Sequence, residues 1–80
     1  MNLELYYYRE CPFCQIVLSA IQQLGIEQLI QFKNTRENPD YRNDLQKLTG
    51  RTQVPCLVID GNPMLESRDI ASFLEKKFMK

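Results

Sequence analysis

Apolar and polar residues alternate at the start of the chain and then recur at helical spacing. In residues 3–8, one face carries Leu3, Leu5 and Tyr7, and this period of two predicts a β-strand. Residues 12–24 predict an amphipathic helix, because their apolar side chains lie three or four positions apart. Gly25 follows and is a typical helix stop. The apolar stripe of this helix is expected to comprise Ile16, Val17, Ala20, Ile21 and Leu24.

The middle of the chain predicts a second strand and a second helix. The short apolar segment 29–32 would pair with the first strand through a right-handed crossover. Asn38, Pro39 and Asp40 supply a helix cap, a first-turn proline and a first-turn acid. We therefore expect a helix that starts here and ends before Gly50. Its predicted buried stripe is Tyr41, Leu45 and Leu48.

Two further strands and a helix complete the predicted order. The most apolar segment, 54–60, predicts a third strand, and the Asp-Gly-Asn-Pro turn at 60–63 leads into a hairpin at Met64 and Leu65. Residues 68–78 predict a last helix, with lysines near its C-terminal end, where the helix dipole favours positive charge. The order is β-α-β-α-β-β-α, which places the chain in the α/β class as a single domain over residues 1–80.

The composition excludes several kinds of function. The chain has 80 residues, ten basic and ten acidic side chains, three cysteines and no histidine. Without histidine, the commonest general base and metal ligand is missing. The balanced charge argues against a nucleic-acid interface, which normally carries a basic excess. An odd number of cysteines does not suit the paired framework of a secreted mini-protein, so we expect a reducing compartment.

The N-terminal segment and the longest apolar run argue against a secretory or membrane protein. The first residues carry no basic start followed by an apolar stretch, which a secretory signal requires. The longest apolar run, residues 54–59, is far shorter than the ~20 residues of a membrane helix. We expect a soluble, cytoplasmic protein that contacts no membrane.

Cys11-Pro12-Phe13-Cys14, at the junction of the first strand and the first helix, carries the candidate chemistry. Unpaired N–H groups and the positive end of the helix dipole favour a thiolate over a thiol there. We predict that Cys11 is an exposed nucleophile, with the Arg9 guanidinium as a further source of positive charge. Cys14 lies three residues on, so the two Cα atoms should be about 5 to 6 Å apart, within disulfide range. Cys14 would then resolve a mixed disulfide formed on Cys11.

A metal site is the alternative interpretation of two cysteines at this spacing. A structural zinc or iron–sulfur site needs two more ligands, and only Cys56 remains. We therefore predict no metal within one chain, although a cluster bridged between two copies stays open. Cys56 itself lies in the most apolar segment and is expected to be a small buried hydrophobe. Among the aromatic residues, we expect Tyr6 and Tyr7 to be mainly structural and Phe13 to be an exposed contact.

Three motifs together resemble the glutaredoxin family of the thioredoxin fold: the Cys-x-x-Cys after the first strand, Gly50-Arg51-Thr52-Gln53-Val54-Pro55 before the third, and the final hairpin and helix. The resemblance implies a four-stranded mixed sheet flanked by three helices, with Pro55 in the cis form. It also implies glutathione as the reductant, whose cysteinyl part pairs with the backbone of Val54 like an added strand.

Two departures from the glutaredoxin pattern modify what the resemblance implies. Tyr8 stands where that family usually has a lysine. Glu66-Ser67 looks like the N-terminal domain of glutathione transferases, where the matching acid and serine hold the γ-glutamyl group; Ser67 would equally cap the last helix. The residues expected to bind glutathione are Tyr8, Arg9, Phe13, Gln53, Val54, Pro55, Glu66 and Ser67.

The sequence therefore predicts a dithiol glutaredoxin with Cys11 and Cys14 as its catalytic pair. Its expected partners are glutathione, as co-substrate, and disulfide-containing or glutathionylated proteins, and it is expected to be a monomer with no tightly bound cofactor. Two alternatives are a thioredoxin-like electron donor that needs no glutathione and a module that binds glutathione or an iron–sulfur cluster. A complete glutathione transferase is not expected, because its all-helical second domain has no counterpart in these 80 residues.

Overall fold

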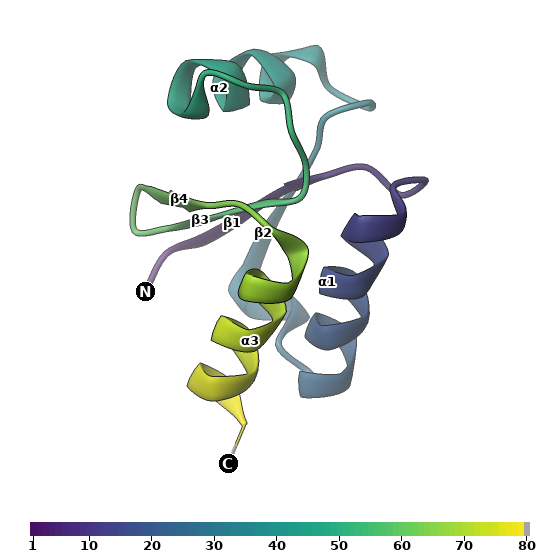
Figure 1. Cartoon of the computed structure of the whole chain (residues 1–80), viewed down its shortest axis with the longest axis vertical. Coiled ribbons are helices and arrows are strands. Elements are labelled where there is room, and N and C mark those ends of the chain that lie inside the picture. Colours follow the sequence, from purple (N-terminus) through teal and green to yellow (C-terminus); the bar gives the residue numbers. More distant parts are fainter. Residues whose placement is uncertain (80) are drawn as a thin grey trace.

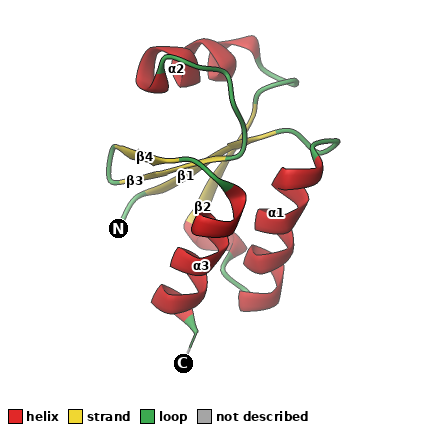
Figure 2. Ribbon diagram, viewed as in Figure 1, coloured by secondary structure: helices red, strands yellow, loops and turns green. Residues whose placement is uncertain are grey.

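A four-stranded sheet with helices on both faces forms the framework of the protein (Figures 1 and 2). The computed structural model describes residues 1–79. In chain order, its elements are β1 (Leu3–Tyr7), α1 (Pro12–Leu24), the 3₁₀ turn η1 (Glu27–Leu29), β2 (Ile30–Asn34), α2 (Pro39–Thr49), β3 (Cys56–Ile59), β4 (Asn62–Met64) and α3 (Ser67–Phe78). The predicted order β-α-β-α-β-β-α is therefore confirmed.

The strands lie side by side in the order β2-β1-β3-β4. β1 pairs in parallel with β2 and antiparallel with β3, so that Leu5 lies between Phe32 and Leu57. β3 and β4 form the antiparallel hairpin expected after residue 60. This mixed sheet with three helices is the thioredoxin fold that the sequence resemblance implies.

Each face of the sheet buries its own core. Figure 2 shows α2 on one side of the sheet and α1 and α3 together on the other. Because alternate residues of β1 point to opposite faces, Tyr7 packs beneath α1 and α3, whereas Tyr6 packs beneath α2 with Leu45 and Cys56. Both tyrosines and Cys56 are buried, as predicted.

The helix ends follow the local signals in the sequence. Asn38 caps α2, its side-chain oxygen accepting a hydrogen bond from the Asp40 N–H at 3.0 Å. Gly25 and Gly50 end α1 and α2 with φ of 67° and 78°, a left-handed conformation that glycine adopts without a steric penalty.

Several expectations about burial and boundaries were wrong. Leu48 is 41% exposed and Ile16 is 42% exposed, because α2 and α1 each present to the sheet a narrower face than their apolar stripes suggest. Leu29 belongs to η1 and not to a strand. The third strand starts at Cys56, so Val54 lies in the loop before it.

No helix among residues 1–79 is both long and apolar enough to span a membrane.

Leu45 and Leu48 provide a direct test of how α2 packs. Leu45 is fully buried under α2, so Leu45→Ala should cost about 2–5 kcal/mol of unfolding free energy. Leu48→Ala on the same helix should change it by no more than about 0.5 kcal/mol, because that side chain is exposed. Urea denaturation of both variants measures this, and equal losses would contradict the orientation of α2.

Candidate active site

Cys11 occupies the N-cap position of α1 and is held there by the chain that follows it. Its sulfur accepts a hydrogen bond from the Cys14 N–H at 3.3 Å, and its carbonyl oxygen accepts the first helical bond from Gln15. Pro12 begins the helix, where a proline is favoured because its missing N–H would have no intrahelical partner. The expected amide contact to the sulfur is therefore present.

The expectation that Cys11 is exposed was wrong. Its side chain is 4% exposed and packs in the core between the sheet and the α1–α3 pair. Its thiol lies 4.0 Å from the carbonyl oxygen of Val54, in the loop before β3. The loop before β3 therefore covers the Cys11 sulfur. The position of Cys11 at the start of a helix predicts an exposed thiol, because it takes no account of this loop.

The other two cysteines differ from Cys11 in their surroundings. Cys14 is fully buried, and this burial, reinforced by the adjacent Cys11 thiol, raises the pKa of Cys14 to about 12. Burial also raises the pKa of Cys56 to about 11, and Cys56 lies beneath α2 on the opposite face of the sheet. All three cysteines are free thiols. Because its pKa is raised to about 12, Cys14 retains its proton near neutral pH.

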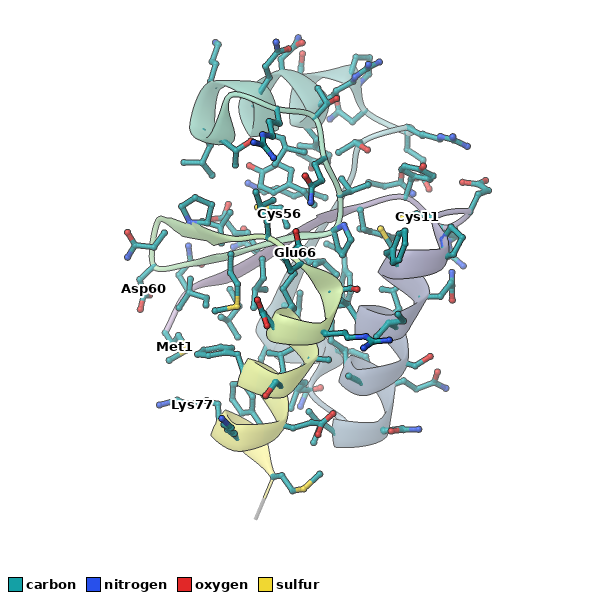
Figure 3. All side chains as sticks on the ribbon, viewed as in Figure 1. Met1, Cys11, Cys56, Asp60, Glu66 and Lys77 are labelled. Atoms are coloured by element: carbon teal, nitrogen blue, oxygen red, sulfur yellow. The ribbon has the colours of Figure 1, made fainter. Side chains whose placement is uncertain are left out.

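A groove of about 640 Å³ lies beside the dithiol, between the start of α1, the loop before β3 and the start of α3. Figure 3 shows Cys11 at the upper end of α1 and Glu66 at the corresponding end of α3. The Val54–Pro55 peptide bond is cis, as the resemblance implies. The residues that line the groove are Phe13, Ile16, Gln53, Val54, Pro55, Glu66, Ser67, Arg68 and Asp69.

The start of α3 leaves backbone donors free at the edge of this groove. Glu66 precedes the helix with a φ of 71° and makes no side-chain cap hydrogen bond. Ser67 is the first helical residue, so the expectation that it caps α3 was wrong. The first helical bond is donated by Ile70, and the N–H groups of residues 67–69 have no intrahelical acceptor. A positive φ on a non-glycine residue costs on the order of 1–3 kcal/mol and is typical of functional sites.

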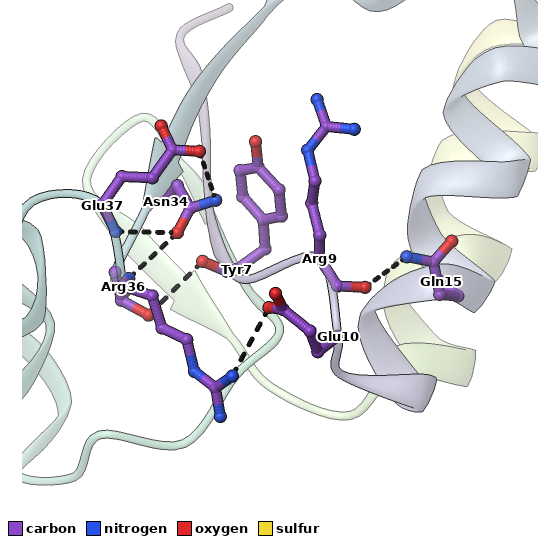
Figure 4. Close-up of polar contacts among 8 residues, drawn as sticks. Tyr7, Arg9, Glu10, Gln15, Asn34, Arg36 and Glu37 are labelled. Carbon is purple, nitrogen blue, oxygen red and sulfur yellow. Dashed lines mark hydrogen bonds and ion pairs between the residues drawn. The ribbon is translucent and has the colours of Figure 1, made fainter.

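Six of the eight residues predicted to bind glutathione line the groove, and two lie elsewhere. Tyr8 borders a separate hollow with Thr35 and Thr52, and the Arg36 guanidinium stacks 3.9 Å from the centre of its ring. Arg9 borders a third hollow on the far side of α1. Figure 4 shows the Arg9 carbonyl accepting from the Gln15 side chain while its guanidinium extends away.

Three groove residues were not predicted: Ile16, Arg68 and Asp69. Ile16 was expected to be buried in the apolar stripe of α1. It lines the groove instead, together with residues at the start of α3. Arg68 and Asp69 follow Ser67 in the first turn of α3. Because Ser67 was predicted to bind glutathione, its two neighbours could have been predicted to line the same site.

Metal ligands do not gather in the described part of the chain. Among residues 1–79, no three side chains of histidine, cysteine, aspartate or glutamate lie close enough together to hold an ion.

A family profile described as "Glutathione S-transferase, N-terminal domain" matches residues 10–77, which include all three cysteines and the whole groove. The chain belongs to this family. The transferase part of the resemblance is therefore confirmed, whereas the specific assignment to the glutaredoxins is not.

Individual relatives agree with this membership. Glutathione S-transferase D7 of Drosophila melanogaster is 29% identical over 99% of this chain, which spans 35% of that protein. Among solved structures, glutathione S-transferase unclassified 2 from Bombyx mori superposes with a TM-score of 0.82 at 27% identity, over 100% of this chain and 37% of that one. A delta-class glutathione transferase from Nilaparvata lugens gives 0.80 at 28% identity, over 98% and 37%. The chain thus spans about a third of the length of these relatives.

The raised pKa values predict that the three thiols react unequally. Iodoacetamide attacks thiolates, so Cys14 and Cys56 should resist alkylation in the folded protein until the pH approaches 11 to 12, and Cys11 should react first at pH 8. Peptide mapping by mass spectrometry at successive times gives the three rates. In urea all three should react alike, and native Cys14 reacting as fast as Cys11 at pH 8 would contradict the asymmetry.

Proposed function

We propose that the chain catalyses glutathione-dependent thiol–disulfide exchange, with Cys11 as nucleophile and Cys14 as the resolving thiol. One observation carries the proposal: a dithiol with unlike surroundings lies beside a groove that ends at an uncapped helix N-terminus. Transferase family membership supports glutathione as the ligand. The second cysteine at disulfide spacing favours exchange over conjugation, because conjugation needs no resolving thiol.

Glutathione would lie along the groove from α3 to Val54. Its γ-glutamyl carboxylate would accept from the free N–H groups of α3 and the Ser67 hydroxyl, and its ammonium group would face Glu66. Val54 lies outside the sheet, and the structure records no backbone hydrogen bond for its N–H within residues 1–79, so this amide can pair with an extended peptide. The cysteinyl sulfur would then meet Cys11, whose thiol is 4.0 Å from the Val54 carbonyl.

The exchange proceeds by two displacements on sulfur. The Cys11 thiolate attacks the glutathionyl sulfur of a mixed disulfide; a Cys11–glutathione disulfide forms, and the substrate leaves as a thiolate that takes a proton. The thiolate of a second glutathione attacks the glutathionyl sulfur of that disulfide, which releases oxidised glutathione and the Cys11 thiolate.

With a protein disulfide, the Cys11 thiolate first forms a mixed disulfide with one substrate sulfur, and the other substrate sulfur leaves as a thiolate that takes a proton. Cys14 then gives up its proton to solvent and attacks the Cys11 sulfur, which breaks the mixed disulfide and releases the second substrate sulfur as a thiolate that takes a proton. Two glutathiones reduce the resulting Cys11–Cys14 disulfide and leave as oxidised glutathione.

Attack by Cys11 requires the sulfur to be reached through the groove. Phe13, which is 63% exposed, and the Val54–Pro55 segment border the groove next to it. A shift of these groups on substrate binding would uncover Cys11, whereas Cys14 remains beneath it.

Serine substitutions separate the roles of the three cysteines. Cys11→Ser should abolish turnover of both a glutathionylated peptide and a protein disulfide. Cys14→Ser should keep the first activity and lose most of the second, because only the second needs a resolving thiol. Coupled NADPH oxidation with glutathione and glutathione reductase measures both rates, and Cys56→Ser is the matched control that should retain them.

Three results from companion assays would contradict the proposal. Turnover supported by a thioredoxin reductase but not by glutathione would favour the thioredoxin-like electron donor. Conjugation of glutathione to chlorodinitrobenzene without any exchange would favour a transferase. Glutathione binding without either activity would favour a binding module.

A further inference from the structure

Cys11 is the last residue of a four-residue turn, residues 8–11, that joins β1 to α1. The Cys11 N–H donates to the Tyr8 carbonyl oxygen at 3.3 Å, which closes the turn. The Arg9 carbonyl oxygen accepts a hydrogen bond from the Gln15 side chain, which ties the turn to α1. The conformation of this turn therefore sets where the Cys11 sulfur lies at the start of the helix.

Arg36, from the loop between β2 and α2, contacts the turn at two points. Its guanidinium lies 3.9 Å from the centre of the Tyr8 ring, and its Nη1 atom lies 3.5 Å from a carboxylate oxygen of Glu10. A guanidinium that stacks on an aromatic face keeps its N–H groups free at the edge, so one side chain makes both contacts. Figure 4 shows the Glu10 carboxylate directed at Arg36, with α1 on the other side of the turn.

The loop that carries Arg36 is itself fixed to the end of β1. The Thr35 N–H donates to the Tyr7 carbonyl oxygen at 2.8 Å. The Asn34 side-chain oxygen accepts from the N–H groups of Arg36 and Glu37, at 2.9 and 3.1 Å. Arg36 thus reaches the turn from a backbone that is hydrogen-bonded to the strand leading into that turn.

Glu10 is the acidic residue next to Cys11 in the chain. A carboxylate close to a thiol disfavours the thiolate, because like charges repel. The ion pair with Arg36 offsets the charge of Glu10 and holds its carboxylate in one direction. The other titratable groups on the elements packed around Cys11 are Tyr7, Tyr8, Arg9, Cys14, Arg51, Glu66, Arg68 and Asp69.

We propose that Arg36 is a positioning residue for Cys11: by stacking on Tyr8 and pairing with Glu10, it holds the Glu10 carboxylate on the side of the turn opposite α1 and so favours the Cys11 thiolate. The inference rests on the proposed role of Cys11 as nucleophile. The side chains of Arg36 and Glu10 are 60% and 68% exposed, so solvent screens the pair and the effect is modest.

The rate of Cys11 alkylation by iodoacetamide, followed in the full-length protein by peptide mapping from pH 5 to pH 10, measures this effect. Arg36→Gln should raise the midpoint of the rate–pH curve by about half a pH unit and slow alkylation about threefold below that midpoint. Arg36→Lys, which keeps the positive charge, should restore most of the rate. A purely structural role predicts the opposite change, because a loosened turn would uncover the buried sulfur and speed its alkylation at every pH.

Arg42→Gln is the matched control, because it removes the same charge from the hollow that Tyr8 and Arg36 border. Among residues 1–79, Arg42 neither pairs with a carboxylate nor stacks on an aromatic ring, so this variant should leave the midpoint unchanged. In a Glu10→Gln background, Arg36→Gln should shift the midpoint less than half as far, because the carboxylate through which it acts is gone. Sodium chloride at 1 M should remove most of the shift in the Arg36→Gln variant.

Four results would overturn the proposal: no midpoint shift in Arg36→Gln, faster alkylation of that variant at every pH, an equal shift in Arg42→Gln, or an undiminished shift in the Glu10→Gln background. Alkylation needs no glutathione. If the predicted shift occurs and the protein still catalyses no thiol–disulfide exchange, the proposed function fails while the role of Arg36 stands.

Discussion

The hydrogen bond from the Cys14 N–H to the Cys11 sulfur is the contact on which the site depends. It closes the first turn of α1, so the same 3.3 Å interaction begins the helix and holds the sulfur at its positive end. It also places Cys14 one turn into the helix, beneath Cys11 and out of contact with water. Burial then raises the pKa of Cys14, so two chemically identical side chains lie in unlike surroundings.

The second half of the site comes from a backbone conformation that costs free energy. Glu66 takes a left-handed φ of 71° just before α3, and no side chain caps that helix. The N–H groups of residues 67–69, which line the groove, consequently have neither an intrahelical acceptor nor a side-chain cap. In the proposed glutathione complex, a carboxylate satisfies these N–H groups, which accounts for the strained turn and the uncapped helix together.

Local signals predicted most of the fold, and tertiary contacts account for what they missed. Asn38 and Gly50 located the ends of α2 to the residue, because capping is decided within a few positions. The exposure of Leu48 and the burial of Cys11 could not be predicted in this way, since they depend on where α2 and the Val54 loop settle.

Within the site too, local motifs predicted some residues correctly, whereas the placement of others depends on the tertiary structure. Gln53, Val54, Pro55, Glu66 and Ser67 were found from short motifs, and the structure brings them to one groove. Arg9 was assigned to that groove because of its closeness in sequence to Cys11, yet it points to the other flank of α1. Neighbours along the chain at a strand–helix junction diverge, because the chain turns there.

The most direct test of a glutathione site at the start of α3 compares two serines of the same helix. Ser67 is buried at the groove, whereas Ser72 is exposed and outside it. Titration with reduced glutathione, followed by ¹⁵N NMR, should shift Val54, Glu66 and Ser67. Ser67→Ala should weaken the binding about tenfold, and Ser72→Ala should leave it unchanged. Absent shifts at those three residues, or equal affinities for both variants, would contradict the account.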